Sequence, residues 1–217
     1  MRPIDLSLYL VTDPAMTARR GLAETVRAAV AGGVTAVQLR DKEACPADLL
    51  EAARALLALL RPLRIPLIVN DDLDVAAAAG ADGVHVGQSD IPPAAARARL
   101  GHAAVVGLSV TRAAEVASVD PAVVDYVGLG PIFPTATKVC AGAALGEEEF
   151  SAIRRRIVVP VVAIGGVGLE NAALAIRAGA DGISVVSAIC AAEDPEGAAR
   201  ALARAVARAR SSSEGPR

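Results

Sequence analysis

The stretch IVNDDLDVAAAAGADGVHVGQSD, residues 68–90, contains two apolar runs that each end in polar and acidic residues. The first run ends at Asn70 and Asp71, a short alanine-rich segment follows, and the second run leads to Gln88 and Asp90. This pattern predicts two parallel strands joined by a helix, with both carboxyl ends at one edge of a sheet. Asp71 and Asp90 are then expected side by side, and two carboxylates favour a hard cation such as Mg²⁺.

The same alternation continues on both sides of this stretch. Strand-like apolar runs are expected at residues 8–12, 34–39, 66–69, 83–86, 104–108, 123–129, 160–164 and 182–186, each followed by a helical segment. Near-continuous apolar strands are typical of a parallel sheet that is covered by helices. Eight such units in 217 residues predict an α/β fold, a single (β/α)8 TIM barrel.

A repeated motif supports closure into a barrel. The segments AGGV (31–34), AGADGV (79–84) and AGADGI (178–183) each end a helix, turn at glycine and begin a strand. Their spacings are near two and four times a unit of about 25 residues, which eight units in this length require. An open doubly wound sheet is the alternative, because it obeys the same crossover rules. We expect one domain over residues 1–210 and a disordered tail over residues 211–217.

Composition restricts the function classes. Hydrophobic residues make up 53% of the chain and charged residues 21%, which is enough apolar material for a large core. The net charge of -2 argues against a nucleic-acid partner. Cys45, Cys140 and Cys190 are widely spaced and predict neither a disulfide framework nor a metal site, which fits a reducing, cytoplasmic location. Neither a signal peptide nor a membrane-spanning run is expected.

In a barrel, functional groups gather at the carboxyl ends of the strands. The residues expected there are Gln38, Arg40, Lys42, Asn70, Asp71, Gln88, Asp90, Ser109, Thr135, Ala136, Thr137, Lys138, Gly165, Gly166 and Ser187. His85 is expected inside a strand and His102 near a helix end, so neither is expected in this ring. Acid–base and nucleophilic catalysis are therefore disfavoured, and charge neutralisation is favoured.

The ring divides into two halves. The cationic and polar half, with a metal ion on the two aspartates, suits a diphosphate, and it consists of Arg40, Lys42, Asn70, Ser109 and Lys138. Gly165–Gly166 and Val186–Ser187 follow the last two strands, where barrels often bind one phosphate through backbone N–H groups. The two halves together predict transfer of a group between two phosphorylated substrates.

Each feature also has a purely structural explanation. Charged runs such as residues 40–42 are usually solvated loops. The pair Asp71–Asp72 could cap the helix that follows it, and Asp90 could also be a helix cap. Glycines punctuate every loop of this chain, so Gly165–Gly166 is a weak signal by itself. The common position at strand ends is what favours a functional site.

Eight runs stand in order along the chain: YLVTD (9–13), QLRDK (38–42), IVNDD (68–72), GVHVGQSD (83–90), VGLS (106–109), YVGLGPIFPTATK (126–138), AIGGV (163–167) and GADGISVVSAI (179–189). This ordered set resembles the thiamine-phosphate synthase family, also called thiamine-phosphate pyrophosphorylases. The resemblance extends from Leu8 to about Ile189. A single run would be weak support, whereas the ordered set is highly specific.

The resemblance implies a TIM barrel and a Mg²⁺-dependent transferase. Its substrates would be 4-amino-2-methyl-5-(diphosphooxymethyl)pyrimidine and a thiazole phosphate, and its products thiamine phosphate and diphosphate. The family mechanism is dissociative: diphosphate leaves, a pyrimidine methylene carbocation forms, and the thiazole nitrogen attacks it. A ring of cations that lacks a base agrees with such a mechanism.

The resemblance also implies roles for individual residues. Asp71 and Asp90 would bind Mg²⁺. The pyrimidine diphosphate would bind to Gln38, Leu39, Arg40, Asp41, Lys42, Asn70, Ser109 and Lys138, among which Arg40, Lys42 and Lys138 would be catalytic. The thiazole phosphate would bind to Thr135, Ala136, Thr137, Gly166, Val186 and Ser187.

Three other functions are compatible with the same barrel. A thiazole tautomerase, an isomerase of similar sequence, would not need the complete diphosphate and metal ring. A non-catalytic barrel that binds a phosphorylated ligand would tolerate loss of the metal carboxylates. Another phosphate-handling barrel would need a carboxylate or histidine placed for proton transfer. Small molecules are the expected partners, without nucleic acid or membrane, and the sequence gives no oligomeric state.

Overall fold

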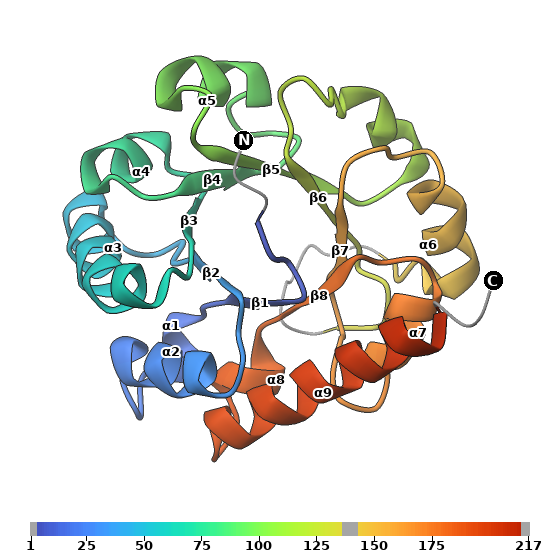
Figure 1. The fold of residues 1–217 in the computed structure, drawn as a ribbon. Coiled ribbons are helices and arrows are strands. Elements are labelled where there is room, and N and C mark those ends of the chain that lie inside the picture. The colour runs from blue at the N-terminus through green and yellow to red at the C-terminus, as the bar shows by residue number, and fades with distance from the viewer. Residues whose placement is uncertain (1–3, 136–142, 214–217) are drawn as a thin grey trace.

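Eight parallel strands form a closed barrel in sequence order (Figure 1). The structure is a computed structural model, and it describes residues 4–135 and 143–213. The strands are β1 (Leu8–Val11), β2 (Ala36–Leu39), β3 (Leu67–Asn70), β4 (Gly83–Val86), β5 (Val105–Val110), β6 (Tyr126–Leu129), β7 (Val161–Ala163) and β8 (Gly182–Val185). The predicted (β/α)8 barrel is confirmed, because β1 pairs with β8 and leaves no open edge.

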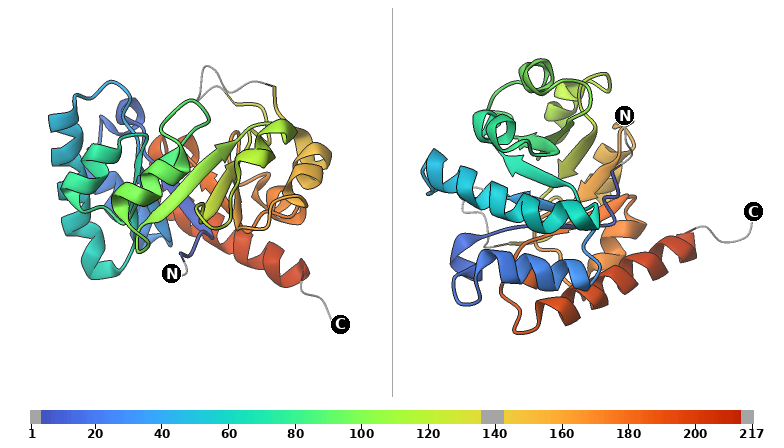
Figure 2. Two further views of the ribbon diagram at one scale, coloured as in Figure 1. Left: turned by 90° about the horizontal axis from the view of Figure 1, so that it is seen from above. Right: turned by 60° about the vertical axis from the view of Figure 1, so that its left-hand side comes forward.

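Helices surround the barrel wall (Figures 1 and 2). They are α1 (Pro14–Thr17), α2 (Leu22–Ala31), α3 (Pro46–Leu60), α4 (Leu73–Ala79), α5 (Pro93–Leu100), α6 (Gly146–Arg154), α7 (Ala172–Arg177), α8 (Ser187–Cys190) and α9 (Pro195–Ser213), with 3₁₀ segments η1 (Arg61–Leu63) and η2 (Ala113–Ser118). The expected helix after β5 is thus the 3₁₀ segment η2. Helix α9 continues through residues 211–213, which were expected in the tail, and residues 214–217 lie outside the described residues.

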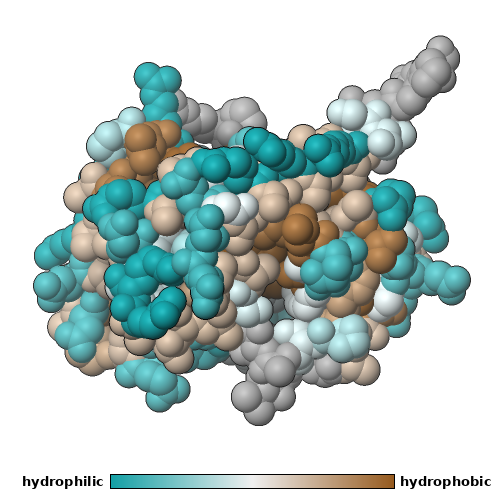
Figure 3. Space-filling view, turned by 90° about the horizontal axis from the view of Figure 1, so that it is seen from below, coloured by the Kyte–Doolittle hydropathy of each residue, from teal (hydrophilic) through white to brown (hydrophobic). Residues whose placement is uncertain are grey.

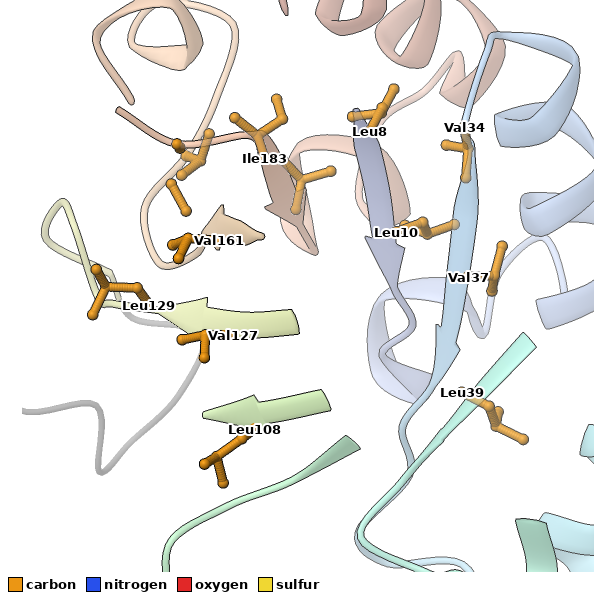
Figure 4. Close-up of a cluster of buried hydrophobic side chains, with 14 of the residues drawn as sticks. Leu8, Leu10, Val34, Val37, Leu39, Leu108, Val127, Leu129, Val161 and Ile183 are labelled. Carbon is orange, nitrogen blue, oxygen red and sulfur yellow. The ribbon is translucent and has the colours of Figure 1, made fainter. Parts of the chain in front are cut away.

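Alternate residues of each strand face opposite sides of the barrel wall. Outward residues such as Leu8, Val37 and Leu108 pack in a large core against the helices (Figure 4). A smaller interior cluster consists of Leu6, Tyr9, Ala36, Ile68, Tyr126 and Val162. Residues 4–7 cross the amino-terminal end of the barrel, where Leu6 belongs to this cluster and Ile4 packs against it (Figure 1). The interior thus has an apolar floor, and its polar residues lie nearer the carboxyl ends of the strands.

A repeated hydrogen bond joins the strands in pairs at the amino-terminal end. In each pair, a side chain just before the even-numbered strand accepts from a backbone N–H of the odd-numbered strand. The four bonds are Leu8 N to Thr35 Oγ1 (3.1 Å), Leu67 N to Asp82 Oδ2 (2.8 Å), Val106 N to Asp125 Oδ2 (2.7 Å) and Val161 N to Asp181 Oδ2 (2.8 Å). We call these four side-chain hydrogen bonds strand clamps. The GADG motif noted in the sequence supplies two of them, through Asp82 and Asp181.

Two of the clamp aspartates also bind an arginine from a preceding helix. Arg97 Nη2 of α5 lies 2.6 Å from Asp125 Oδ2, and the two side chains are only 7% and 5% exposed. Arg154 Nη2 of α6 lies 2.9 Å from Asp181 Oδ2, with side chains 22% and 45% exposed. The two pairs have the same topology but differ in burial, so they should differ in their contribution to stability.

The surface carries mainly polar side chains on the face in Figure 3, with apolar side chains in smaller groups. Among the described residues, the large exposed apolar ones are Leu63, Ile91, Val158 and Leu169, which lie in four separate segments. Among residues 4–135 and 143–213, no helix combines the length and apolar character needed to cross a membrane.

We predict that Arg97→Ala lowers the free energy of unfolding by about 3–5 kcal/mol, because Asp125 would become an unpaired buried carboxylate. Arg154→Ala is the matched control and should lose only about 1–2 kcal/mol, since water reaches Asp181. Urea unfolding followed by circular dichroism compares the two variants. Equal losses would contradict the different burial of the two pairs.

Candidate functional site

Asp71 and Asp90 lie together where β3 and β4 end. Asp71 follows β3 with a left-handed backbone, at φ 61°. Asp90 lies in the turn after β4, where its Oδ2 accepts from the Gly87 N–H at 2.7 Å. The cap of α4 is the neighbouring Asp72, whose Oδ1 accepts from the Val75 N–H at 2.8 Å. Capping therefore does not explain the Asp71 carboxylate, which remains available to the site.

The electrostatics of the pair fit a divalent cation. Burial raises the pKa of Asp71, and contact with the Asp90 carboxyl group raises it further. Lys42 opposes this rise, with its Nζ 3.2 Å from Asp71 Oδ2. Two crowded carboxyl groups favour a shared proton, and a cation relieves the same repulsion. No cluster of three or more His, Cys, Asp or Glu occurs in the described part of the chain, and Mg²⁺ needs only one or two carboxylates beside water and phosphate oxygens.

Arg40 and Lys42 follow β2 on the side of the barrel next to β3. The Arg40 backbone is joined to the end of β1, because its N–H donates to Thr12 Oγ1 at 3.0 Å. The Lys42 side chain is 52% exposed and contacts Asp71. The structure thus brings the Lys42 ammonium group into contact with the Asp71 carboxylate. It also holds the backbone of Arg40 at the same edge of the barrel.

Two predicted substrate-binding residues next to Arg40 have structural tasks. Asp41 Oδ1 accepts from the backbone N–H groups of Glu43 and Ala44, at 3.0 and 3.1 Å. The Leu39 side chain is buried in the outer core, so only its backbone is available to a ligand (Figure 4). A cavity of about 260 Å³ borders Arg40 and Asp41, but its lining is mainly apolar and comes largely from α1, α2 and α3.

Gln38, Asn70 and Ser109 lie on the interior side of their strands, and Ser109 has a partner that the sequence analysis missed. Its Oγ lies 2.9 Å from Nε2 of His85. His85 lies inside β4 as predicted, but its side chain contacts a residue of the ring, which the sequence analysis did not anticipate. His85 is the register partner of Asn70, so strand alternation would have placed both on the interior side.

The opposite half of the ring is built from tight turns. Gly165 and Gly166 both have left-handed backbones, at φ 89° and 66°. A Cβ atom on Gly166 would collide with the Pro134 carbonyl oxygen, so glycine allows the loops after β6 and β7 to meet. Asn171 Nδ2 holds this turn by donating to the Gly166 carbonyl at 2.8 Å. The turn after β7 therefore lies against the residues that precede Thr135.

The remaining predicted residues fall into three groups. Half-buried Val186 directly precedes the short helix α8, and exposed Ser187 is its first residue. Ala136, Thr137 and Lys138 lie outside the described residues. Gln88 links the loop after β4 to β5, because its Nε2 donates to the Ser109 carbonyl at 2.7 Å.

Comparison with known proteins agrees with the resemblance seen in the sequence. The family model described as thiamine monophosphate synthase matches residues 8–189. A thiamine-phosphate synthase of Azorhizobium caulinodans is 59% identical over 200 residues, which cover 92% of this chain and 94% of that protein. One from Xanthobacter autotrophicus is 57% identical over 209 residues, covering 96% and 99%. A solved thiamine phosphate pyrophosphorylase from Pyrococcus furiosus is 34% identical with a TM-score of 0.85, covering 95% of this chain and 98% of its own.

We predict that Asp71→Asn does not destabilise the metal-free protein at neutral pH. The pKa of Asp71 is raised above 3.8 in the folded state, so ionisation opposes folding, and this cost grows as pH rises through the raised pKa. Asparagine removes the charge and tolerates a left-handed backbone, while the loss of the partly exposed pair with Lys42 has a small effect. Thermal unfolding in EDTA measures this directly.

The same variant should lose its response to metal. Mg²⁺ should raise the melting temperature of the wild type, because it binds only the folded state, and should leave Asp71→Asn unchanged. Asp72→Asn is the control, since asparagine also caps helices and the metal response should persist. An unchanged Mg²⁺ response in Asp71→Asn would contradict the assignment.

Proposed function

The chain belongs to the thiamine monophosphate synthase family, and we propose that it joins 4-amino-2-methyl-5-(diphosphooxymethyl)pyrimidine to a thiazole phosphate, releasing diphosphate. The observation that carries this proposal is the crowded carboxyl pair of Asp71 and Asp90, with Lys42 in contact. Such a pair suits a cation that is completed by phosphate oxygens. A thiazole tautomerase or a passive phosphate binder has no need of it.

The diphosphate half would act by charge neutralisation. Asp71 and Asp90 would hold Mg²⁺, which when bound draws negative charge from the diphosphate oxygens. Lys42 and Arg40 would stabilise the charge that develops on the leaving diphosphate. Asn70 would donate its side-chain N–H to the same group. Lys138 is proposed for the same task from the family resemblance alone.

The other half would hold the nucleophile. Gly166, Val186 and Ser187, with the 135–137 segment, would bind the single phosphate of the thiazole and aim its nitrogen at the pyrimidine methylene carbon. This nitrogen attacks through its lone pair, so no proton has to be removed. Both ring nitrogens of His85 already contact protein partners, Tyr126 and Ser109, which agrees with a mechanism that lacks a general base.

Two further expectations belong to the proposal. A cytoplasmic location is supported by the free thiols of Cys45 and Cys190, while Cys140 lies outside the described residues. Folding of residues 1–210 as one domain is supported by the single closed barrel. Limited proteolysis that released a stable smaller fragment would argue against the second expectation.

Product formation tests the reaction. Purified protein, both substrates and Mg²⁺ should give thiamine phosphate, and EDTA should abolish the product because the diphosphate loses its counter-charge. Chromatography with fluorescence detection of the oxidised product follows the reaction. Folded protein that makes no thiamine phosphate under these conditions would overturn the proposed function.

Lys42→Ala should lower kcat by about 100-fold, because it removes a charge that acts mainly on the departing diphosphate. The KM for thiazole phosphate should change little. Arg54→Ala is the control, since Arg54 is an exposed cation on α3 and should leave both constants unaltered. Steady-state kinetics with each substrate varied in turn makes the comparison, and an effect confined to thiazole phosphate KM would exclude this role.

A further inference from the structure

A buried chain of hydrogen bonds crosses the interior of the barrel. It runs from Gln38 on β2 through Tyr9 on β1, Tyr126 on β6 and His85 on β4 to Ser109 on β5. Gln38 Nε2 lies 3.0 Å from Tyr9 Oη, which lies 2.8 Å from Tyr126 Oη. Tyr126 Oη lies 2.9 Å from His85 Nδ1, and His85 Nε2 lies 2.9 Å from Ser109 Oγ. Both ends of the chain are residues proposed to bind the pyrimidine substrate.

The barrel wall is shaped to admit this chain. A Cβ atom on Gly107 would collide with both His85 Nδ1 and the Tyr126 hydroxyl group. A Cβ atom on Gly128 would lie 3.3 Å from His85 Cε1. Two interior positions on β5 and β6 thus lack side chains where the bond between His85 and Tyr126 forms.

The orientation of the Gln38 amide, with Nε2 toward Tyr9, sets the direction of the chain. Burial raises the pKa of both tyrosines, so each hydroxyl keeps its single proton. Gln38 Nε2 can only donate, so Tyr9 must donate to Tyr126, and Tyr126 must donate to His85 Nδ1. His85 then carries its own proton on Nε2 and donates it to Ser109 Oγ.

We propose that this chain fixes the hydrogen-bonding character of Gln38 and Ser109 together and thereby selects the heterocycle edge that the site accepts. Gln38 uses an N–H in the chain and keeps Oε1, which is an acceptor. Ser109 accepts from His85 and keeps its hydroxyl proton for a ligand. A heterocycle that carries an N–H donor and a ring-nitrogen acceptor, as an aminopyrimidine does, has the groups that complement the two ends.

Tyr9 and Tyr126 are positioning residues in this scheme, since they act through Gln38 and His85. Turning the Gln38 amide would reverse every bond, move the His85 proton to Nδ1 and exchange donor for acceptor at both ends. The two ends therefore cannot change independently. The inference rests on the proposed function for the identity of the ligand, but the direction of the chain is a property of the unliganded protein.

The His85 tautomer tests that direction. Long-range ¹H–¹⁵N correlation spectra of ¹⁵N-histidine-labelled, unliganded protein should show a neutral ring with the proton on Nε2. His102→Gln assigns the signals, because His102 is the second histidine of the chain and is exposed. A proton on Nδ1 would overturn the inference. This measurement needs neither turnover nor a substitution among the five hydrogen-bonded residues, so it decides the direction even if the proposed reaction fails.

Two tyrosine variants separate positioning from packing. Tyr126→Phe removes the donor to His85 Nδ1 and should give a mixture of tautomers, whereas Tyr9→Phe leaves that donor in place and should keep the Nε2 proton. Tyr126→Phe should also lower kcat/KM for the pyrimidine substrate roughly tenfold, and thiazole phosphate KM should stay within about twofold. An unchanged tautomer in Tyr126→Phe, or equal effects on both substrates, would contradict the proposal.

Discussion

Closure of eight parallel strands forces every second strand residue into a narrow interior, and the rest of this structure follows from how that space is filled. Outward residues are apolar and bind the helices to the wall. The interior takes Tyr9 and Tyr126 instead, with glycine at 107 and 128 to make room. A buried hydroxyl needs a hydrogen-bond partner, so filling the interior with tyrosine commits the barrel to a polar network. That network ends at the rim where the candidate site lies, so under the proposed function core packing and substrate recognition would share the same side chains.

The two ends of the barrel carry different tasks. At the amino-terminal end, side-chain clamps satisfy strand N–H groups, and the buried pair of Arg97 and Asp125 adds stability there. At the carboxyl end, Asp71 adopts a left-handed backbone and crowds Asp90, an arrangement that opposes folding. The site can carry this strain because the opposite end holds the strands in register. Such a division is typical of barrels whose loops carry the chemistry.

The spacing of apolar runs was enough to predict the barrel, because each unit is local and the repeat length is nearly constant. Strand ends also indicated Asp71 and Asp90 correctly as neighbours, since parallel strands end at one edge. Spacing could not assign tasks among adjacent residues: Asp72 caps α4 in place of Asp71, and Asp41 supports its own loop. The contact of His85 with the ring was missed because only its position along the strand was considered. Strand alternation places its side chain on the interior face, like that of its register partner Asn70. The end of α9 lies three residues beyond the predicted end, because local sequence defines the last turn of a helix poorly.

The four strand clamps have a consequence for modularity. Each clamp lies within a pair of consecutive strands, from β1–β2 to β7–β8, and none of the four crosses a boundary between pairs. The barrel can thus be regarded as four two-strand units, each of which contains its own clamp. A chimera that exchanges a whole two-strand unit with a related barrel keeps all four clamps. A crossover placed between β5 and β6 instead separates Asp125 from the β5 strand that it clamps.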